Sequence, residues 1–321
     1  MDCRLVRVRF GATARLRRQI TLIDLVEGVA ARRAARATRD ARAVIVSGAT
    51  TALLLKPPGV PWAVRFDSPV LLNRPGWSGA WQRARERRVL PAAEVLLPWG
   101  PAAAAAAAPL LAAAARPPQV IALPSPVSAP PPVPAAERTG EAVAYGGWLW
   151  KRGIDVLAAA WAKAAPPGAR LVVGGCDRAA GRAWLERCGV PEPPGIEWAG
   201  TVDGDAWLAR VGRARVFVNA SRREDHGLAQ LEALAAGTPL VTVPSPGAYE
   251  ALPLARRLTP GLVAADGSAP ALARALRSAF ALDDADRARI AADARAAMAP
   301  YARAAVLERV RRELLPALGL R

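Results

Sequence analysis

The chain has 321 residues, of which 52% are hydrophobic, and a formal net charge of +17. The length predicts two domains, and the apolar content is enough for a core in each. The charge would ordinarily suggest a nucleic-acid or anionic-membrane partner. However, all but three of the 44 basic residues are arginines, and no block of five or six occurs. We therefore expect no nucleic-acid partner, only a diffuse positive field that attracts anionic donors or lipid head groups.

Three cysteines, an odd number without metal-ligand spacing, indicate a reducing compartment; they are Cys3, Cys176 and Cys188. Met1–Phe10 alternates arginine with apolar residues, which is not the pattern of a signal peptide. The alanine-rich stretch Pro101–Ala115 is too short to span a bilayer. We expect a cytoplasmic protein, either soluble or peripheral on the inner face of the cell membrane.

The first half of the chain alternates short apolar strands with helices. The predicted strands are Arg4–Phe10, Ala43–Ser47, Trp62–Phe66, Glu94–Leu97 and Val120–Leu123, and the predicted helices are Thr21–Arg39, Trp81–Pro91 and the alanine-rich run. Asp67 and Arg74 follow the strand that ends at Phe66, and ligands lie beyond such strand ends in parallel α/β sheets. A turn-forming aspartate and a loop arginine are equally good structural explanations.

A proline-rich segment, PSPVSAPPPVP at 124–134, excludes helix and favours an extended connector. It divides the chain into domains 1–134 and 135–321. The last predicted helix, Tyr301–Leu318, has apolar residues on one side.

The second half repeats strand and helix regularly, as in a parallel α/β domain. The predicted strands are Ala142–Tyr145, Arg170–Val173, Ile196–Ala199, Val216–Asn219 and Leu240–Val243, and the predicted helices are Ile154–Ala164, Asp205–Gly212 and one that opens at Gly227.

Two glutamates, Glu224 and Glu232, are separated by seven residues and flank the helix that Gly227 opens. The free N–H groups of Gly227 and Leu228 attract phosphate or sugar oxygens, and each carboxylate can accept hydrogen bonds from vicinal hydroxyls. A ligand with both a phosphate and a polyol fits this pattern. The alternative is a pair of ordinary surface charges on an α/β crossover.

A second candidate is the turn Gly146-Gly147, followed by Lys151 and Arg152. It predicts a diphosphate clamp, or simply a tight turn with solvated basic residues. Neither a P-loop nor a GxGxxG fingerprint is present. Asp203-Gly204-Asp205 spells a DxD motif, but its place between a strand and a helix favours an N-cap over a metal site.

His226 is the only histidine, and no nucleophile motif lies nearby, so we expect no hydrolase.

The string Glu224-Asp225-His226-Gly227-Leu228, continued by Glu232 through Val241, resembles the E-x7-E signature and the following G-x-P-V-V strand of a known family. These are the retaining glycosyltransferases of the GT-B group often called family 4. Ser221, Gly247, Glu250, the Gly174 turn and the turn from Lys151 to Gly153 also fall where that family has counterparts. The resemblance covers the chain from about residue 142 to its end.

The resemblance implies an α/β protein with two Rossmann-like domains, the first abbreviated, facing across a cleft. It also implies that the last helix crosses back onto the first domain. It implies that Glu224 meets hydroxyls of the transferred sugar and that Glu232 binds ribose hydroxyls. Gly227 and Leu228 would offer N–H groups, and Arg152 would neutralise the leaving diphosphate without a metal or other cofactor. Gly146, Gly147, Lys151 and His226 complete the expected donor site.

Two departures from the family pattern concern the donor turn and the first domain. The family usually has an arginine where this chain has Gly147, and Lys151 is the candidate substitute. The first domain lacks the family's glycine-rich loop and its cleft histidine. Asp67 is our candidate for the role of that histidine, with Arg74 beside it on the acceptor side.

We therefore expect a retaining, hexosyltransferase-type enzyme that uses a nucleotide-diphosphate sugar and builds a polysaccharide, a glycolipid or another cell-envelope glycan. Two alternatives stay open. One is a non-catalytic subunit that binds a nucleotide sugar or a partner. The other is a binder of nucleic acid or anionic surfaces, suggested only by the charge.

Overall fold

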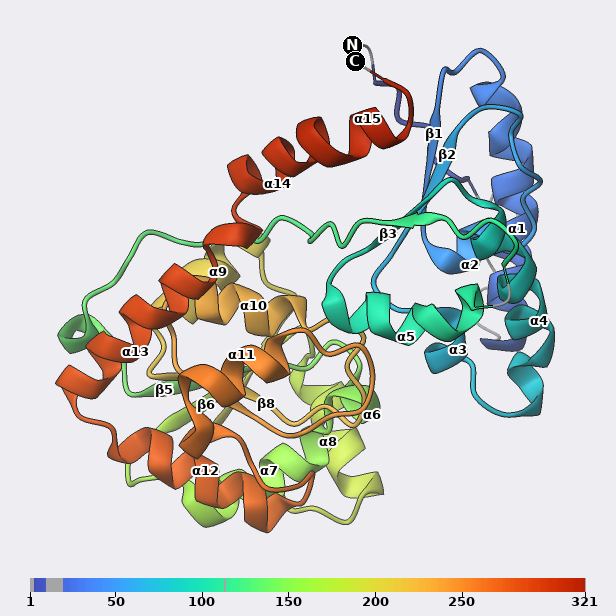
Figure 1. Cartoon of the computed structure of the whole chain (residues 1–321). Coiled ribbons are helices and arrows are strands. Elements are labelled where there is room, and N and C mark those ends of the chain that lie inside the picture. The colour runs from blue at the N-terminus through green and yellow to red at the C-terminus, as the bar shows by residue number, and fades with distance from the viewer. Residues whose placement is uncertain (1–2, 10–19, 113, 321) are drawn as a thin grey trace. The chain divides into compact units, whose positions relative to one another are not determined.

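The computed structural model describes residues 3–9, 20–112 and 114–320. The chain divides into two compact units, the first made of Met1–Ser125 with Ala304–Arg321 and the second of Pro126–Arg303. Each unit has its own parallel sheet (Figure 1). The segment from Pro126 to Pro134 contains no helix or strand, as its prolines predict.

Unit 1 contains a four-stranded sheet with the order β1-β2-β3-β4, all parallel. Its strands are β1 (Val44–Ser47), β2 (Trp62–Phe66), β3 (Val95–Pro98) and β4 (Gln119–Val120). Its helices are α1 (Ile20–Ala34), α2 (Ala49–Ala52), α3 (Val70–Asn73), α4 (Ala80–Val89) and α5 (Pro101–Leu111). The backbone beyond β4 continues along β3, because the N–H of Ile121 donates to Leu96 at 2.9 Å and that of Leu123 donates to Pro98 at 2.8 Å.

The predicted first strand is wrong over the described residues 3–9, which contain no strand, while Phe10 lies outside the described residues. Alternation of arginine with apolar residues favours a strand only where a neighbouring strand accepts its hydrogen bonds. The described sheet begins at β1, with β2 as its neighbour.

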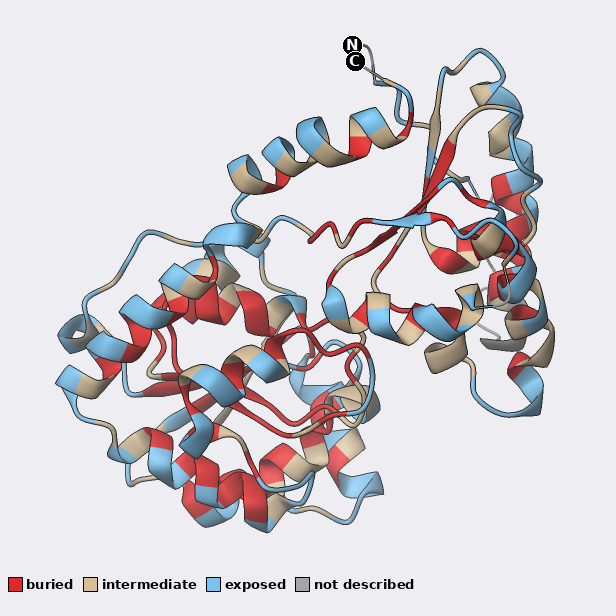
Figure 2. Cartoon of the chain, in the orientation of Figure 1, coloured by how far each residue is buried: buried red, intermediate tan, exposed pale blue. Residues whose placement is uncertain are grey.

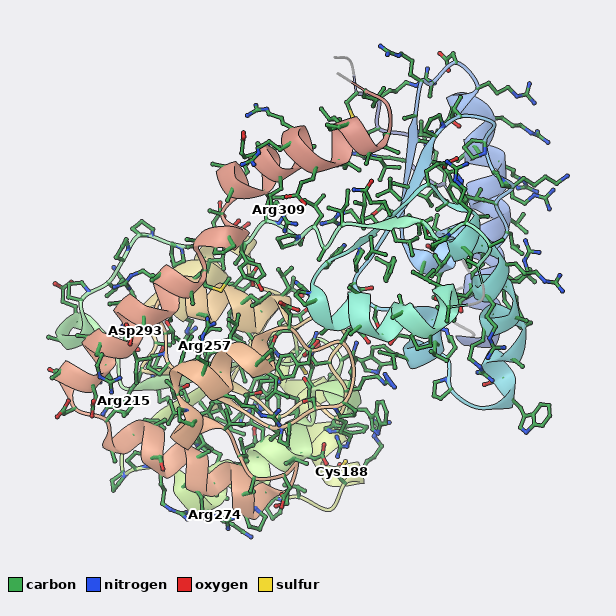
Figure 3. All side chains as sticks on the ribbon, viewed as in Figure 1. Cys188, Arg215, Arg257, Arg274, Asp293 and Arg309 are labelled. Carbon is green, nitrogen blue, oxygen red and sulfur yellow. The ribbon has the colours of Figure 1, made fainter. Side chains whose placement is uncertain are left out.

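The C-terminal segment belongs to unit 1. It forms α14 (Arg303–Arg309), a π-helical turn at Val310–Leu314 and α15 (Leu315–Ala317), where one helix was predicted. Pro316 has no N–H group, which accounts for the change in hydrogen-bond pattern just before it. Val306, Leu314 and Leu318 pack in one core with residues of β2 and β3. Arg309 (labelled in Figure 3) donates to the Ala122 carbonyl at 2.6 Å.

Unit 2 contains a five-stranded parallel sheet with the order β7-β6-β5-β8-β9. Its strands are β5 (Glu141–Tyr145), β6 (Arg170–Gly174), β7 (Ile196–Gly200), β8 (Val216–Asn219) and β9 (Leu240–Thr242). Its helices are α6 (Leu149–Arg152), α7 (Ile154–Ala164), α8 (Arg178–Arg187), α9 (Gly204–Arg213), α10 (Leu228–Ala235), α11 (Ala251–Leu258), α12 (Ala269–Ala281) and α13 (Asp284–Ala297).

Helices cover both faces of this sheet, and its strands are mostly buried, except that β7 at the edge is half-buried throughout (Figure 2). Alternate residues of β5 belong to different cores, since Ala142 and Ala144 pack with α7 and α12 whereas Val143 packs with α10 and α13. This is the two-residue period of a strand buried on both sides. The rigid sheet positions the loops at its carboxyl edge, where the candidate residues lie.

Candidate functional site

The strand order of unit 2 creates one switch point, between β5 and β8. From β5 the chain proceeds to β6 and β7 on one side of the sheet, and it then returns to β8 and β9 on the other. The loops after β5 and β8 therefore leave the sheet in different directions and open a crevice, which is where open α/β sheets bind ligands. These two loops contain most of the predicted donor-site residues.

Backbone and side-chain hydrogen bonds join the two loops. The N–H of Arg222 donates to the Lys151 carbonyl at 2.9 Å, and the Arg222 guanidinium donates to the Trp150 carbonyl at 2.8 Å and to Asp155 at 2.9 Å. Gly153, with φ at +61°, allows the end of α6 to approach β8 closely, because a Cβ there would lie 2.1 Å from the Ala220 carbonyl oxygen. Helix α6 is thus held against the end of β8.

Arg152, at the end of α6, forms an ion pair with Glu224 after β8. The Glu224 side chain is only 4% exposed. The same carboxylate oxygen, Oε2, accepts from Ser221 Oγ at 3.2 Å and from Gln230 Nε2 at 3.0 Å. A buried carboxylate with a cation and two neutral donors is well compensated, so Glu224 is held in one orientation.

Lys151 forms a second ion pair across the same two loops, with Asp225. The other carboxylate oxygen of Asp225, Oδ1, is buried and accepts no hydrogen bond from the described residues. The cations predicted to clamp a diphosphate therefore both face carboxylates of the E-x7-E segment. A bound diphosphate would share or replace these partners.

Helix α10 begins at Leu228 with Gly227 as its N-cap residue. No side chain caps this helix, so its first N–H groups are open to a ligand anion. The preceding loop is fixed by a close approach at Gly247, where φ is +123° and a Cβ would lie 2.0 Å from the Glu224 carbonyl oxygen. The N–H of Glu224 donates to the Pro246 carbonyl at 3.0 Å, and that of Glu250 donates to the His226 backbone carbonyl at 3.0 Å.

Glu232 lies on the second turn of α10 and is partly buried. Burial raises the pKa of its carboxyl from 4.5 to about 7. Among the described residues, none donates a hydrogen bond to it or forms an ion pair with it, so no described residue offsets the desolvation of this carboxyl group. Such a carboxylate gains most from hydroxyl donors that a ligand supplies.

A buried polar cluster supports these loops from behind the switch point. Asn219 Nδ2 donates to Thr242 Oγ1 at 3.1 Å and to the Tyr249 hydroxyl at 3.2 Å, while Thr242 and Tyr249 are 2.7 Å apart. Complete burial raises the pKa of Tyr249. Asn219 Oδ1 in turn accepts from Ser221 Oγ at 2.6 Å, which links the cluster to Glu224.

The structure brings the predicted donor residues of unit 2 together at this edge of the sheet: Gly146, Gly147, Lys151, Arg152, Glu224, His226, Gly227, Leu228 and Glu232. Asp67 and Arg74 lie in unit 1. Asp67 follows β2 and accepts from the Ser68 N–H at 2.8 Å. Arg74 makes a two-pronged ion pair with the buried Asp24, at 2.7 and 2.8 Å. Their roles toward an acceptor stay predictions.

Sequence patterns missed Gln230 and the Asn219–Thr242–Tyr249 cluster. A polar residue inside an otherwise apolar strand, such as Asn219 in VFVN, is the signal that could have revealed the cluster. Gln230 is harder to recognise, because it is two residues from Glu232 and its contact with Glu224 depends on how the loop folds.

The Asp203 side chain caps α9, accepting from Asp205 N at 3.0 Å and Ala206 N at 3.3 Å. The N-cap interpretation of the DxD motif is therefore confirmed. Within the described residues, no group of three or more histidine, cysteine, aspartate and glutamate side chains could hold a metal ion. None of the described helices is long and apolar enough to cross a membrane.

Residues 140–281 match the family described as Glycosyl transferases group 1. No curated protein matches the chain significantly. Among solved structures, sucrose-phosphate synthase from Thermosynechococcus elongatus is 20% identical, with a TM-score of 0.73 over 98% of this chain and 84% of that one. Trehalose-6-phosphate synthase from Burkholderia multivorans is 17% identical, with a TM-score of 0.66 over 94% and 77% of the two chains. Anabaena HepE, solved with UDP and glucose, is 14% identical, with a TM-score of 0.66 over 95% and 83%.

The solved structures establish the fold: two parallel-sheet α/β units of the GT-B type. The family match falls on unit 2 and contains the switch-point loops described above. The chain therefore has the GT-B fold, and its unit 2 carries a match to Glycosyl transferases group 1.

Proposed function

We propose that the enzyme transfers a sugar from a nucleotide-diphosphate sugar and retains its anomeric configuration. The observation that carries this proposal is the Arg152–Glu224 ion pair at the switch point, beside the uncapped N-terminus of α10. A cation and open N–H groups suit a diphosphate, while buried carboxylates suit sugar hydroxyls. Two solved relatives are in keeping with such a donor: HepE is in complex with UDP and glucose, and an Escherichia coli protein is bound with UDP-2-fluoro glucose.

In the proposed donor complex, Glu224 accepts hydrogen bonds from hydroxyls of the transferred sugar. The N–H groups of Gly227 and Leu228 meet sugar or phosphate oxygens, and Glu232 accepts from the two ribose hydroxyls. The last contact would supply hydrogen-bond donors to a carboxylate that has none among the described residues. Hydroxyl donors stabilise the ionised form, so binding would lower the pKa of Glu232 from about 7.

Arg152 is the proposed electrostatic catalyst. Negative charge grows on the diphosphate as the bond from the anomeric carbon to its oxygen breaks, and a fixed guanidinium stabilises that charge in the transition state. The acceptor hydroxyl forms the new bond on the face that the diphosphate vacates, and its proton passes to a phosphate oxygen. Lys151 adds a second positive charge in place of a side chain at Gly147. No step of this proposal requires a metal.

The acceptor is proposed to be a glycan, a glycolipid or another cell-envelope component, with Asp67 and Arg74 as acceptor-side candidates. Asp67 lies just beyond the carboxyl end of β2, which suits a ligand contact. Peripheral binding to the inner face of the cell membrane also belongs to the proposal, supported by the +17 charge.

The test is donor turnover by the full chain with a panel of UDP-, GDP- and ADP-sugars, measured as release of the nucleoside diphosphate. Arg152→Ala, Glu224→Ala and Glu232→Ala should each lower kcat/KM, by about 100-fold for Arg152 if it stabilises the leaving charge. Glu186→Ala, at an exposed position of α8, is the control and should leave turnover unchanged. Full turnover in the Arg152 and Glu224 variants would sink the site assignment.

A non-catalytic nucleotide-binding subunit is the second candidate, favoured by two observations. Gly147 presents no side chain to a diphosphate, and both nearby cations already face carboxylates. This candidate predicts that a nucleoside diphosphate binds while no sugar is transferred to an acceptor or to water. Detectable hydrolysis of any donor by the wild-type chain, absent in Arg152→Ala, would exclude it.

A further inference from the structure

Tyr145 is the last residue of β5, and the residue is 40% exposed. The four residues before it in the strand are buried. A large aromatic ring at the carboxyl end of the strand beside the switch point is not needed for the core of the sheet. The ring instead lies over the turns that follow β5 and β6.

Two glycines make room for this ring. A Cβ at Gly147 would lie 2.5 Å from the Tyr145 hydroxyl oxygen and 2.8 Å from Cζ. A Cβ at Gly175 would lie 2.8 Å from Cε2 of the same ring. All three distances are well inside van der Waals contact, so any larger residue at either position must displace Tyr145. The Tyr145 ring thus occupies the space that a side chain at position 147 would need.

The ring also contacts the proposed catalytic cation. The guanidinium carbon of Arg152 lies 5.3 Å from the ring centroid, within the range of a cation–π interaction. Nη1 of the same guanidinium pairs with Glu224. Nε is buried and donates to no described residue. The guanidinium is therefore held by a ring and by a carboxylate, and it keeps an unused N–H donor.

We propose that Tyr145 is a positioning residue of the donor site, whose ring holds the Arg152 guanidinium so that it can reach the diphosphate. This inference rests on the proposed function, because it assigns Arg152 to a diphosphate ligand. Without the ring, the guanidinium is free to turn toward Glu224 and make a fuller ion pair, which a diphosphate must then break. The glycines at 147 and 175 keep the ring in place.

The experiment is isothermal titration of the full chain with UDP, GDP and ADP, followed by a mutant cycle with whichever binds most tightly. Tyr145→Leu removes the π face but keeps an apolar side chain of moderate size. It should raise the Kd about fivefold, the order expected for loss of a partly exposed cation–π contact. Tyr145→Phe keeps the face and should stay within about twofold of wild type. Gly147→Ala displaces the ring and should weaken binding in the same direction as Tyr145→Leu.

The decisive comparison is Tyr145→Leu in an Arg152→Ala background, where it should have no further effect on Kd. An equal weakening with and without Arg152 would overturn the inference, because the ring would then act on the ligand by itself. Wild-type binding with an unchanged Kd in Tyr145→Leu, whether or not the melting temperature falls, would also overturn it and leave the proposed function intact. Failure of the wild-type chain to bind any of the three nucleotides would overturn both.

Discussion

Glu232→Gln should stabilise the ligand-free protein at alkaline pH, because it removes a carboxylate that burial keeps from ionising freely. The pKa of Glu232 is raised from 4.5 to about 7 by desolvation. Each pKa unit corresponds to 1.36 kcal/mol, so full ionisation would cost about 3 kcal/mol. The side chain is partly exposed, and solvent screening reduces the expected gain from glutamine to about 1–2 kcal/mol.

The pH dependence has a definite sign. Between pH 4.5 and about 7 the folded state holds a proton on Glu232 that the unfolded state has released. The contribution of protonated Glu232 to wild-type stability should therefore be fully present below pH 4.5 and be lost as pH rises through about 7. The Glu232→Gln variant should lack this loss. Thermal unfolding at pH 5 and pH 8.5 measures it. The melting temperature of Glu232→Gln should exceed that of wild type by about 3–6 °C at pH 8.5 and by less at pH 5.

The control is Glu186→Gln, which removes the same charge from an exposed position of α8. It should change the melting temperature little, and equally at both pH values. A Glu232→Gln variant that is destabilised, or whose advantage is the same at pH 5 and pH 8.5, would refute the claim that this carboxylate is buried without a compensating partner.

Three further predictions concern the support of the site. Gly247→Ala should destabilise the protein by about 1–3 kcal/mol in urea unfolding and abolish turnover, because φ is +123° and the new Cβ would meet the Glu224 carbonyl oxygen. The control is Gly204→Ala, which has open space around it and should change neither stability nor turnover. Tyr249→Phe should cost about 1–3 kcal/mol in the same assay, since it removes a buried partner of Thr242, and an unchanged unfolding midpoint would contradict this. Asp203→Ala should lower the free energy of unfolding by about 1 kcal/mol, because the α9 cap is lost. Donor turnover by this variant should stay unchanged, with or without EDTA. A loss of turnover would restore the metal interpretation of the DxD motif.

Much of unit 2 could be predicted because its strands and turns follow strong local rules. Val216–Asn219 and Ile154–Ala164 have the bounds expected from their apolar runs, and Gly227 caps α10 as its position suggests. A buried parallel strand is a continuous apolar run, and a glycine commonly marks the turn that follows it. These local signals are enough to place the loops of the donor site.

Unit 1 was less predictable, because tertiary contacts determine its ends. The segment after residue 3 alternates arginine with apolar residues, as a strand would, yet residues 3–9 do not join the sheet. The C-terminal helix has the expected apolar side, but its hydrogen bonding becomes π-helical over Val310–Leu314, just before Pro316. Arg74 looked like a ligand-binding loop residue, and its pairing with Asp24, fifty positions away, follows from no local pattern.

Within the site, residue identities suggested which side chains act but not how they pair. The ion pairs of Lys151 with Asp225 and of Arg152 with Glu224 join loops more than seventy residues apart. They depend on β5 and β8 being neighbours, which is a property of the strand order. The role of Tyr145 depends likewise on the turns at Gly147 and Gly175 lying side by side.

The most direct test of the central claim is a crystal structure of the protein with the nucleoside diphosphate that it binds most tightly. We predict the diphosphate within about 4 Å of the Arg152 guanidinium, beside the N-terminus of α10, with the ribose hydroxyls hydrogen-bonded to Glu232. A nucleotide bound away from the β5–β8 switch point, or with its diphosphate out of reach of Arg152, would contradict it.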